Sequence, residues 1–216
     1  MDPRLLNDLT VYIEWEGDVQ WLALGPEDAD ASSWNLPERW RQALLTPGAS
    51  AVKIAALWSG LEDLLPRTLA AYTGKVHGLG LLKTRLRGLS LVYVFDNSGD
   101  LTGYRGFPPV PGLPEVAARF PVDLSPFYKV HDGLVQLASF DGGPLPVAEW
   151  QTLRDQDTDE PSLVKVVMDG PNAFGFDISE QPVQAYAVLS SIEEVEPVAD
   201  VWAYLDELLA LPIENF

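Results

Sequence analysis

The chain has 216 residues, a net charge of −18 and no cysteine, and 47% of its residues are hydrophobic. This composition is typical of a folded chain with a sizeable core, and it excludes disulfides, zinc–thiolate centres and cysteine nucleophiles. The first residues are too polar for a secretory signal, and no apolar stretch reaches the roughly 18–20 residues of a membrane helix. We therefore expect a cytoplasmic protein.

The first part of the chain predicts short strands followed by helices. Residues 11–15 and 19–24 are rich in β-branched and aromatic residues around a glycine turn, which predicts a β-hairpin. Pro37 stands at a first-turn position and predicts a helix over residues 38–45. Apolar residues that recur at a spacing near 3.6 predict a second helix over residues 51–65.

A hydrophobic run at residues 89–95, LSLVYVF, predicts a buried strand. The turn-forming residues after it predict a return strand over residues 101–105. Glycines and prolines then exclude regular structure from residues 106–112. We place a candidate boundary here, between an N-terminal extension of residues 1–110 and a core of residues 111–216.

The second part predicts helices, then a run of strands, then a closing helix. The predicted helices are 114–120, 127–131, 147–154 and 198–211, and the predicted strands are 134–140, 163–168, 173–178 and 184–189. The last three strands are spaced like an antiparallel meander. Because strands and helices are segregated, we expect an α+β fold rather than a regular βαβ alternation.

The negative charge is distributed unevenly along the chain. Residues 121–216 hold 18 of the 32 acidic residues and only 3 of the 14 basic ones. A surface of this kind repels nucleic acid and anionic membranes, and it attracts a cationic protein. The alternative interpretation is that the acidity only maintains solubility.

No residue pattern predicts a catalytic site. The two histidines, His77 and His131, have no nucleophile motif beside them, and His131 next to a helix end is better explained as structural. Lys83, Arg85 and Arg87 form a small basic group, which we interpret as a solvated strand edge or loop. Paired carboxylates that act as acid and base stay open as an alternative.

No metal or cofactor is predicted either. Asp155, Asp157 and Asp159 have the spacing that begins a calcium loop, but the next residue is Glu160 instead of the required glycine. Position twelve of such a loop would be Val166, which offers no carboxylate. Phosphate-binding and dinucleotide-binding glycine motifs are also absent from the sequence.

Residues 110–210 resemble the SUKH superfamily, which comprises bacterial toxin-immunity proteins and eukaryotic regulatory relatives. The resemblance rests on the segments LPEVAARFPVDLSPFYKVHDGL and GGPLPVAEWQTLRD, and on the closing VWAYLDELL. Phe127 and Tyr128 match an aromatic pair that precedes a turn, here His131-Asp132-Gly133. A Leu-Pro step into a following helix matches as well.

The resemblance implies an α+β fold with a mixed, largely antiparallel sheet flanked by helices, here with an N-terminal α/β extension. It also implies a non-catalytic protein that binds and neutralises a cognate toxin, such as a nuclease, that is delivered to rival cells. A regulatory scaffold of the same fold is the alternative. The candidate contact residues are the carboxylates of two acidic loops: Asp155, Asp157, Asp159, Glu160, Glu193, Glu194 and Glu196.

Overall fold

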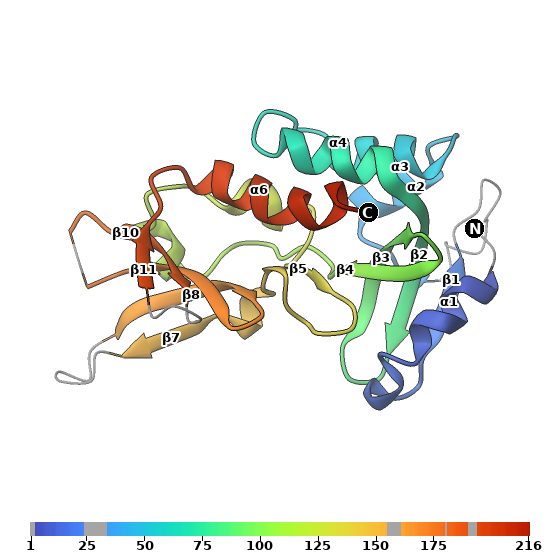
Figure 1. Cartoon of the computed structure of the whole chain (residues 1–216), viewed down its shortest axis with the longest axis horizontal. Helices are drawn as coiled ribbons and strands as arrows, with labels where there is room; N and C mark the ends of the chain where they lie inside the picture. Colours follow the sequence, from blue (N-terminus) through green and yellow to red (C-terminus); the bar gives the residue numbers. More distant parts are fainter. Residues whose placement is uncertain (1–2, 24–33, 155–160, 180, 190–193) are drawn as a thin grey trace.

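The computed structural model describes residues 3–23, 34–154, 161–179, 181–189 and 194–216 (Figure 1). Two antiparallel sheets lie next to each other, and helices cover one side of both. Among these residues, none of the helices has the length and apolar character needed to cross a membrane.

The first sheet has five strands in the order in which they occur in the chain. They are β1 (Gln20–Ala23), β2 (Val76–Thr84), β3 (Gly88–Asn97), β4 (Asp100–Gly106) and β5 (Leu134–Gln136). Every neighbouring pair is antiparallel. Residues 89–95 therefore lie at the centre of a sheet, where both faces of the strand are buried.

The second sheet is a meander with a short strand at one side. Its order is β11-β10-β9-β8-β6, and β7 pairs with another part of β8. The strands are β6 (Gly143–Pro144), β7 (Gln151–Arg154), β8 (Pro161–Asp169), β9 (Asn172–Asp177), β10 (Gln184–Leu189) and β11 (Glu194–Pro197). All of these pairings are antiparallel as well. The predicted α+β class is confirmed, and the strands form two sheets.

The helices form a layer above the sheets in Figure 1, apart from α1, which lies at the lower right. They are α1 (Pro3–Thr10), α2 (Glu38–Leu45), α3 (Ser50–Leu57), α4 (Pro66–Lys75), α5 (Ser125–Tyr128) and α6 (Val201–Glu214). Helix α6 packs against α4 and also contacts β6 of the second sheet. It therefore ties the two parts of the chain together.

One hydrophobic core includes residues from both sides of the predicted boundary. Trp58, Tyr72 and Phe95 come from the first part, and Phe174 and Leu209 come from the second. Strand β5, which follows the boundary, completes the sheet of the first part. The division near residue 110 stays a prediction, to which we return below.

Several predicted elements are confirmed. Helix α2, the β3–β4 hairpin and the meander β8–β9–β10 lie where the sequence places them. These elements could be predicted because the turn residues and the proline that mark their ends lie next to them in the sequence. Trp58, which follows the end of α3, is buried in the core, and Trp202 packs against that core.

The hairpin predicted over residues 11–24 is wrong. Leu6, Leu9 and Ile13 are buried together, and their spacing of three and four residues is that of a helix. The chain therefore forms α1 and then a 3₁₀ turn at Glu14–Glu16. Strand β1 pairs with β2 from farther along the chain.

Two other predictions are corrected. The helix expected over 51–65 ends at Leu57, because Gly60 adopts a positive φ of 86° and Pro66 starts a separate helix, α4. The helix expected over 147–154 is a single 3₁₀ turn followed by β7. Pairing with β8 overrides the helical tendency of this segment.

Candidate protein-binding surface

The structure places only part of the predicted contact set. Asp155, Asp157, Asp159, Glu160 and Glu193 lie outside the described residues. Glu194 and Glu196 are exposed on β11, which is the edge strand of the second sheet rather than a loop. Residues two apart on a strand point to the same face, so these two carboxylates share one side of that edge.

Many acids of the second half serve the fold. Asp206 accepts hydrogen bonds from the backbone amides of Arg67 (3.0 Å) and Thr68 (2.7 Å), and Glu214 forms an ion pair with Arg67 at 2.8 Å. Five more accept a hydrogen bond from a backbone amide: Asp123, Asp132, Asp141, Asp177 and Asp200. Much of the charge excess is thus structural.

Four acids of this half behave differently. The carboxyls of Asp169, Glu194, Glu196 and Glu207 form no hydrogen bond or ion pair with any described residue. Such groups do not stabilise the fold through a partner of their own, and their mutual repulsion opposes it. Among the acids of this half that the structure describes, they are therefore the ones whose carboxyls are available to another molecule.

Tyr204 on α6 is the point around which three of these acids gather. Its ring stacks on Phe174 with centroids 4.9 Å apart, which holds it over β9. Burial raises the pKa of Tyr204, and the negative charges of Asp169 and Glu196 raise it further. Glu207 is one helical turn further along α6. Carboxylates from a strand end, an edge strand and a helix thus share one region.

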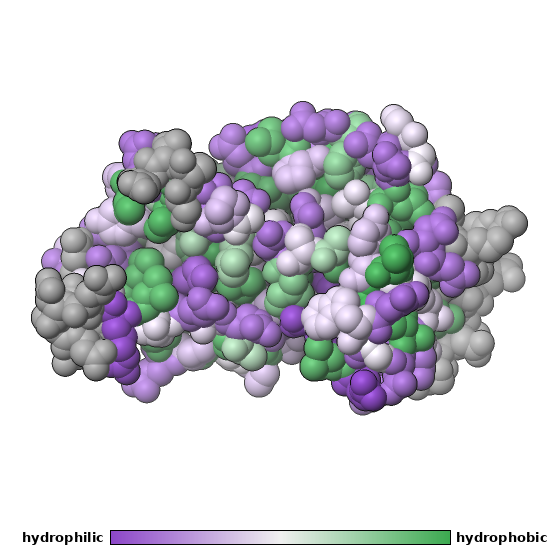
Figure 2. Space-filling model, turned by 60° about the horizontal axis from the view of Figure 1, so that its bottom comes forward, coloured by the Kyte–Doolittle hydropathy of each residue, from purple (hydrophilic) through white to green (hydrophobic). Residues whose placement is uncertain are grey.

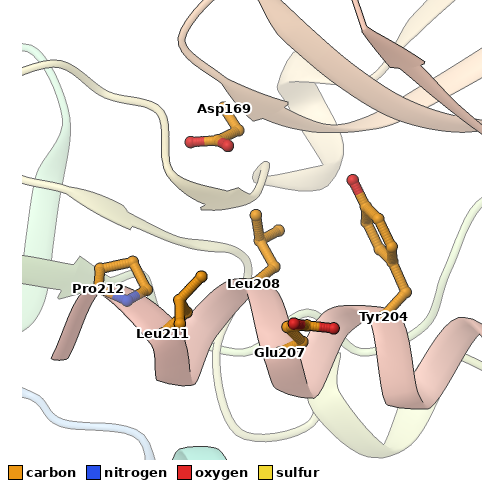
Figure 3. A pocket seen from close by; sticks show the side chains of 6 residues that line it. All are labelled: Asp169, Tyr204, Glu207, Leu208, Leu211 and Pro212. Carbon is orange, nitrogen blue, oxygen red and sulfur yellow. The ribbon is translucent and has the colours of Figure 1, made fainter. Parts of the chain in front are cut away.

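A groove opens in this region, with a volume of about 220 Å³. Its lining residues, which we call the α6 groove, are Asp169, Tyr204, Glu207, Leu208, Leu211 and Pro212. Figure 3 shows Asp169 on the side opposite the helix, with Leu208 and Tyr204 pointing toward it from α6. Burial raises the pKa of Asp169, and the nearby charge of Asp141 acts in the same direction.

His131, the histidine beside the predicted turn, is fully buried and structural. Trp58 Nε1 donates to Tyr93 Oη at 2.8 Å, so the tyrosine hydroxyl is left to donate to His131 Nε2 at 2.5 Å. Burial lowers the pKa of His131 to about 3, which keeps the ring neutral. The ring has no access to a substrate. His77, by contrast, is exposed on β2 rather than in a loop.

Sequence reasoning missed a buried ion cluster in the first sheet. Glu16 accepts from Arg105 Nη1 at 2.6 Å and from Thr84 Oγ1 at 2.8 Å, and Arg87 Nε lies 3.5 Å from the same carboxylate. The guanidinium of Arg87 also covers the ring of Phe140 at 3.4 Å. Arg87 is therefore largely covered, which corrects its interpretation as part of a solvated edge.

A second exposed feature lies at the α1 end of the molecule. Trp15 is 63% exposed, and Val11, Tyr12 and Leu86 are exposed as well. Leu86 donates its amide to the carbonyl of Glu16, which brings it close to the segment that holds Trp15. We call these four residues the Trp15 patch. Figure 2, which brings the underside of the molecule forward, shows hydrophobic and hydrophilic residues interspersed.

Within the described part of the chain, no group of three His, Asp or Glu side chains is arranged to hold a metal ion. Comparisons with protein-family models, with curated proteins and with solved structures found no match to this chain.

Proposed function

We propose that this protein binds a positively charged partner protein through the acidic surface that surrounds the α6 groove. By its resemblance to the SUKH superfamily, it would be a cytoplasmic immunity protein whose partner is a toxin. Binding, rather than catalysis, would be the activity. The observation that supports this proposal is the set of four carboxyls without partners among the described residues, two of which line an open groove.

The distinction between paired and unpaired acids matters here. A carboxylate that pairs with an arginine is compensated by that charge, and one that accepts backbone amides keeps its charge but is held in place by the fold. The carboxylates of Asp169, Glu194, Glu196 and Glu207 have neither a cationic partner nor an amide donor among the described residues. A basic partner would be steered to this side, chiefly through a faster association rate and the rejection of acidic competitors.

The test begins with a toxin gene that neighbours this one. Co-expression of the protein with that toxin should restore viability, and the purified pair should associate at a rate that falls steeply with salt. Glu194→Lys with Glu196→Lys should slow association by about tenfold or more at low salt, because two attractive charges become repulsive.

The matched control is Asp8→Lys with Glu14→Lys, which changes the net charge equally on the α1 side. This variant should associate almost like the wild type. A toxin that kills despite co-expression would refute the immunity role, and equal effects of both variants would show that net charge, rather than this surface, matters.

The Trp15 patch favours one alternative, a regulatory scaffold that holds two partners. A large exposed Trp beside other apolar side chains is typical of a protein contact. The patch lies at the α1 end, and β11 lies at the other end of the molecule in Figure 1. Trp15→Ala should release one of two captured proteins if the scaffold is correct, and should leave toxin neutralisation unchanged if it is not.

A further inference from the structure

We propose that the α6 groove receives one lysine or arginine side chain of the partner. This inference rests on the proposed function and makes it specific, since it names the group that the acidic surface recognises.

The lining of the groove offers both apolar and acidic groups to such a side chain. Leu208, Leu211 and Pro212 form an apolar wall on α6, Glu207 lies beside them on the same helix, and Asp169 at the end of β8 lies across from it. Lysine and arginine combine an apolar stem with a cationic tip. The stem would lie on the apolar wall, and the tip would lie between the two carboxylates.

The size of the groove favours one side chain over a larger ligand. Pockets for drug-sized molecules and cofactors measure roughly 300–1,000 Å³. The α6 groove, with about 220 Å³, is smaller than that range. Its volume still admits one long side chain, which would also contact the ring of Tyr204, and a cation near an aromatic ring is stabilised further.

The electrostatics exclude the other occupants that the shape would admit. An anion would meet Asp169 and Glu207, and Asp141 and Glu196 lie close enough to act on the same region. A purely apolar group would bury Asp169 more deeply without a partner, which is costly. The charge of Arg67 interacts with that of Glu207, but Arg67 already forms an ion pair with Glu214.

The experiment uses capped single amino acids as probes against the full chain. N-acetyl-arginine amide and N-acetyl-lysine amide should shift the NMR signals of Leu208 and Tyr204, with dissociation constants on the order of millimolar, as expected for one side chain. N-acetyl-citrulline amide has nearly the shape of the arginine probe but no charge, and it should cause almost no shift.

Two double variants distinguish a specific effect of the groove from an effect of net charge. Asp169→Asn with Glu207→Gln should weaken arginine binding by about tenfold or more. Asp8→Asn with Glu14→Gln removes the same amount of charge on the α1 side and should change binding by about twofold or less, as expected for screened charges at a distance. Equal shifts with citrulline, no shift with either cation, or equal effects of both variants would overturn the inference.

The same two variants separate this inference from the proposed function. If the toxin is neutralised and the groove variant neutralises it as well as the wild type, the groove inference fails while the function stands. If no toxin is neutralised, the immunity function fails, and the probe titration still decides what the groove binds.

Discussion

At the residue scale, the ion pair between Glu16 and Arg105 is the feature most sensitive to change. Both side chains are almost fully buried, and the carboxylate also accepts from Thr84. Burial lowers the pKa of Arg105, and the charge of Glu16 opposes that effect. Each partner therefore makes burial of the other tolerable.

We predict that Glu16→Gln destabilises the fold by about 3–5 kcal/mol, because it leaves a buried guanidinium without a counter-charge. Urea unfolding of both proteins measures the difference. Glu38→Gln is the control, since Glu38 pairs with Arg41 on the surface and its loss should change stability little. Similar losses in the two variants would show that the buried pair has no special role.

His131 predicts a pH dependence of stability. Its folded pKa is about 3, whereas an imidazole in the unfolded chain has a pKa near 6.5. The folded state therefore lacks a proton that the unfolded state gains, and stability is lost as the pH falls from 6.5 toward 3. The free energy of unfolding should fall by up to about 1.4 kcal/mol per pH unit below pH 6.5.

The window between pH 6.5 and 5 isolates this effect from most carboxylates, which titrate lower. Urea unfolding across that window tests it. His131→Gln keeps an acceptor for the Tyr93 hydroxyl but does not titrate, so its slope should be smaller by about one proton. An unchanged slope would show that another group causes the loss.

At the scale of elements, α6 organises the molecule because its side chains hold other elements in place. Asp206 accepts the first amides of α4 and the hydroxyl of Thr68, so one helix caps the other. Asp200 caps α6 itself by accepting from the amide of Ala203. The two aspartates are six residues apart, but Asp200 binds an amide three residues away, whereas Asp206 binds amides of a helix far away in the sequence.

We predict that Asp206→Ala costs about 2–4 kcal/mol, because it leaves the amides of Arg67 and Thr68 without their acceptor, while the Thr68 hydroxyl keeps only the backbone carbonyl of residue 206. Asp200→Ala should cost only about 1 kcal/mol, the usual value for a lost helix cap on the surface. Thermal and urea unfolding of the pair measure both. An equal loss would mean that solvent replaces Asp206 at the start of α4.

At the scale of the whole molecule, the shared core predicts that the chain unfolds as one unit. The largest cluster joins Trp58 under the helices of the first part to Leu209 and Phe174 of the second, and α6 packs on α4. Single domains with one continuous core usually unfold in one cooperative transition.

We therefore expect circular dichroism and tryptophan fluorescence to report the same urea midpoint. Trp58 reports on the first part and Trp150, which packs on Phe120 and Tyr128, reports on the second. In a variant that keeps Trp58 or Trp150 as its single tryptophan, with the other six replaced, the fluorescence curve should coincide with the circular dichroism curve of the same variant. Separate midpoints would instead support two independent units divided near residue 110.

The candidate surface could be predicted only in part from the sequence. The sequence places Glu194 and Glu196 in an acidic segment, and the structure finds them exposed. It gives no sign of the α6 groove, because Asp169 ends a strand and Glu207 lies on a helix some forty residues later. Only the packing of α6 against the second sheet brings them together.

The sequence by itself determined the α+β class, the β3–β4 hairpin, the meander and the uneven charge, since these depend on composition and on neighbouring residues. The tertiary structure alone decided that residues 11–15 are not a strand, that residues 151–154 are, and which carboxylates remain unpaired. The reason is physical: strand pairing, ion pairing and capping join groups far apart in the chain, and sequence patterns report only local spacing.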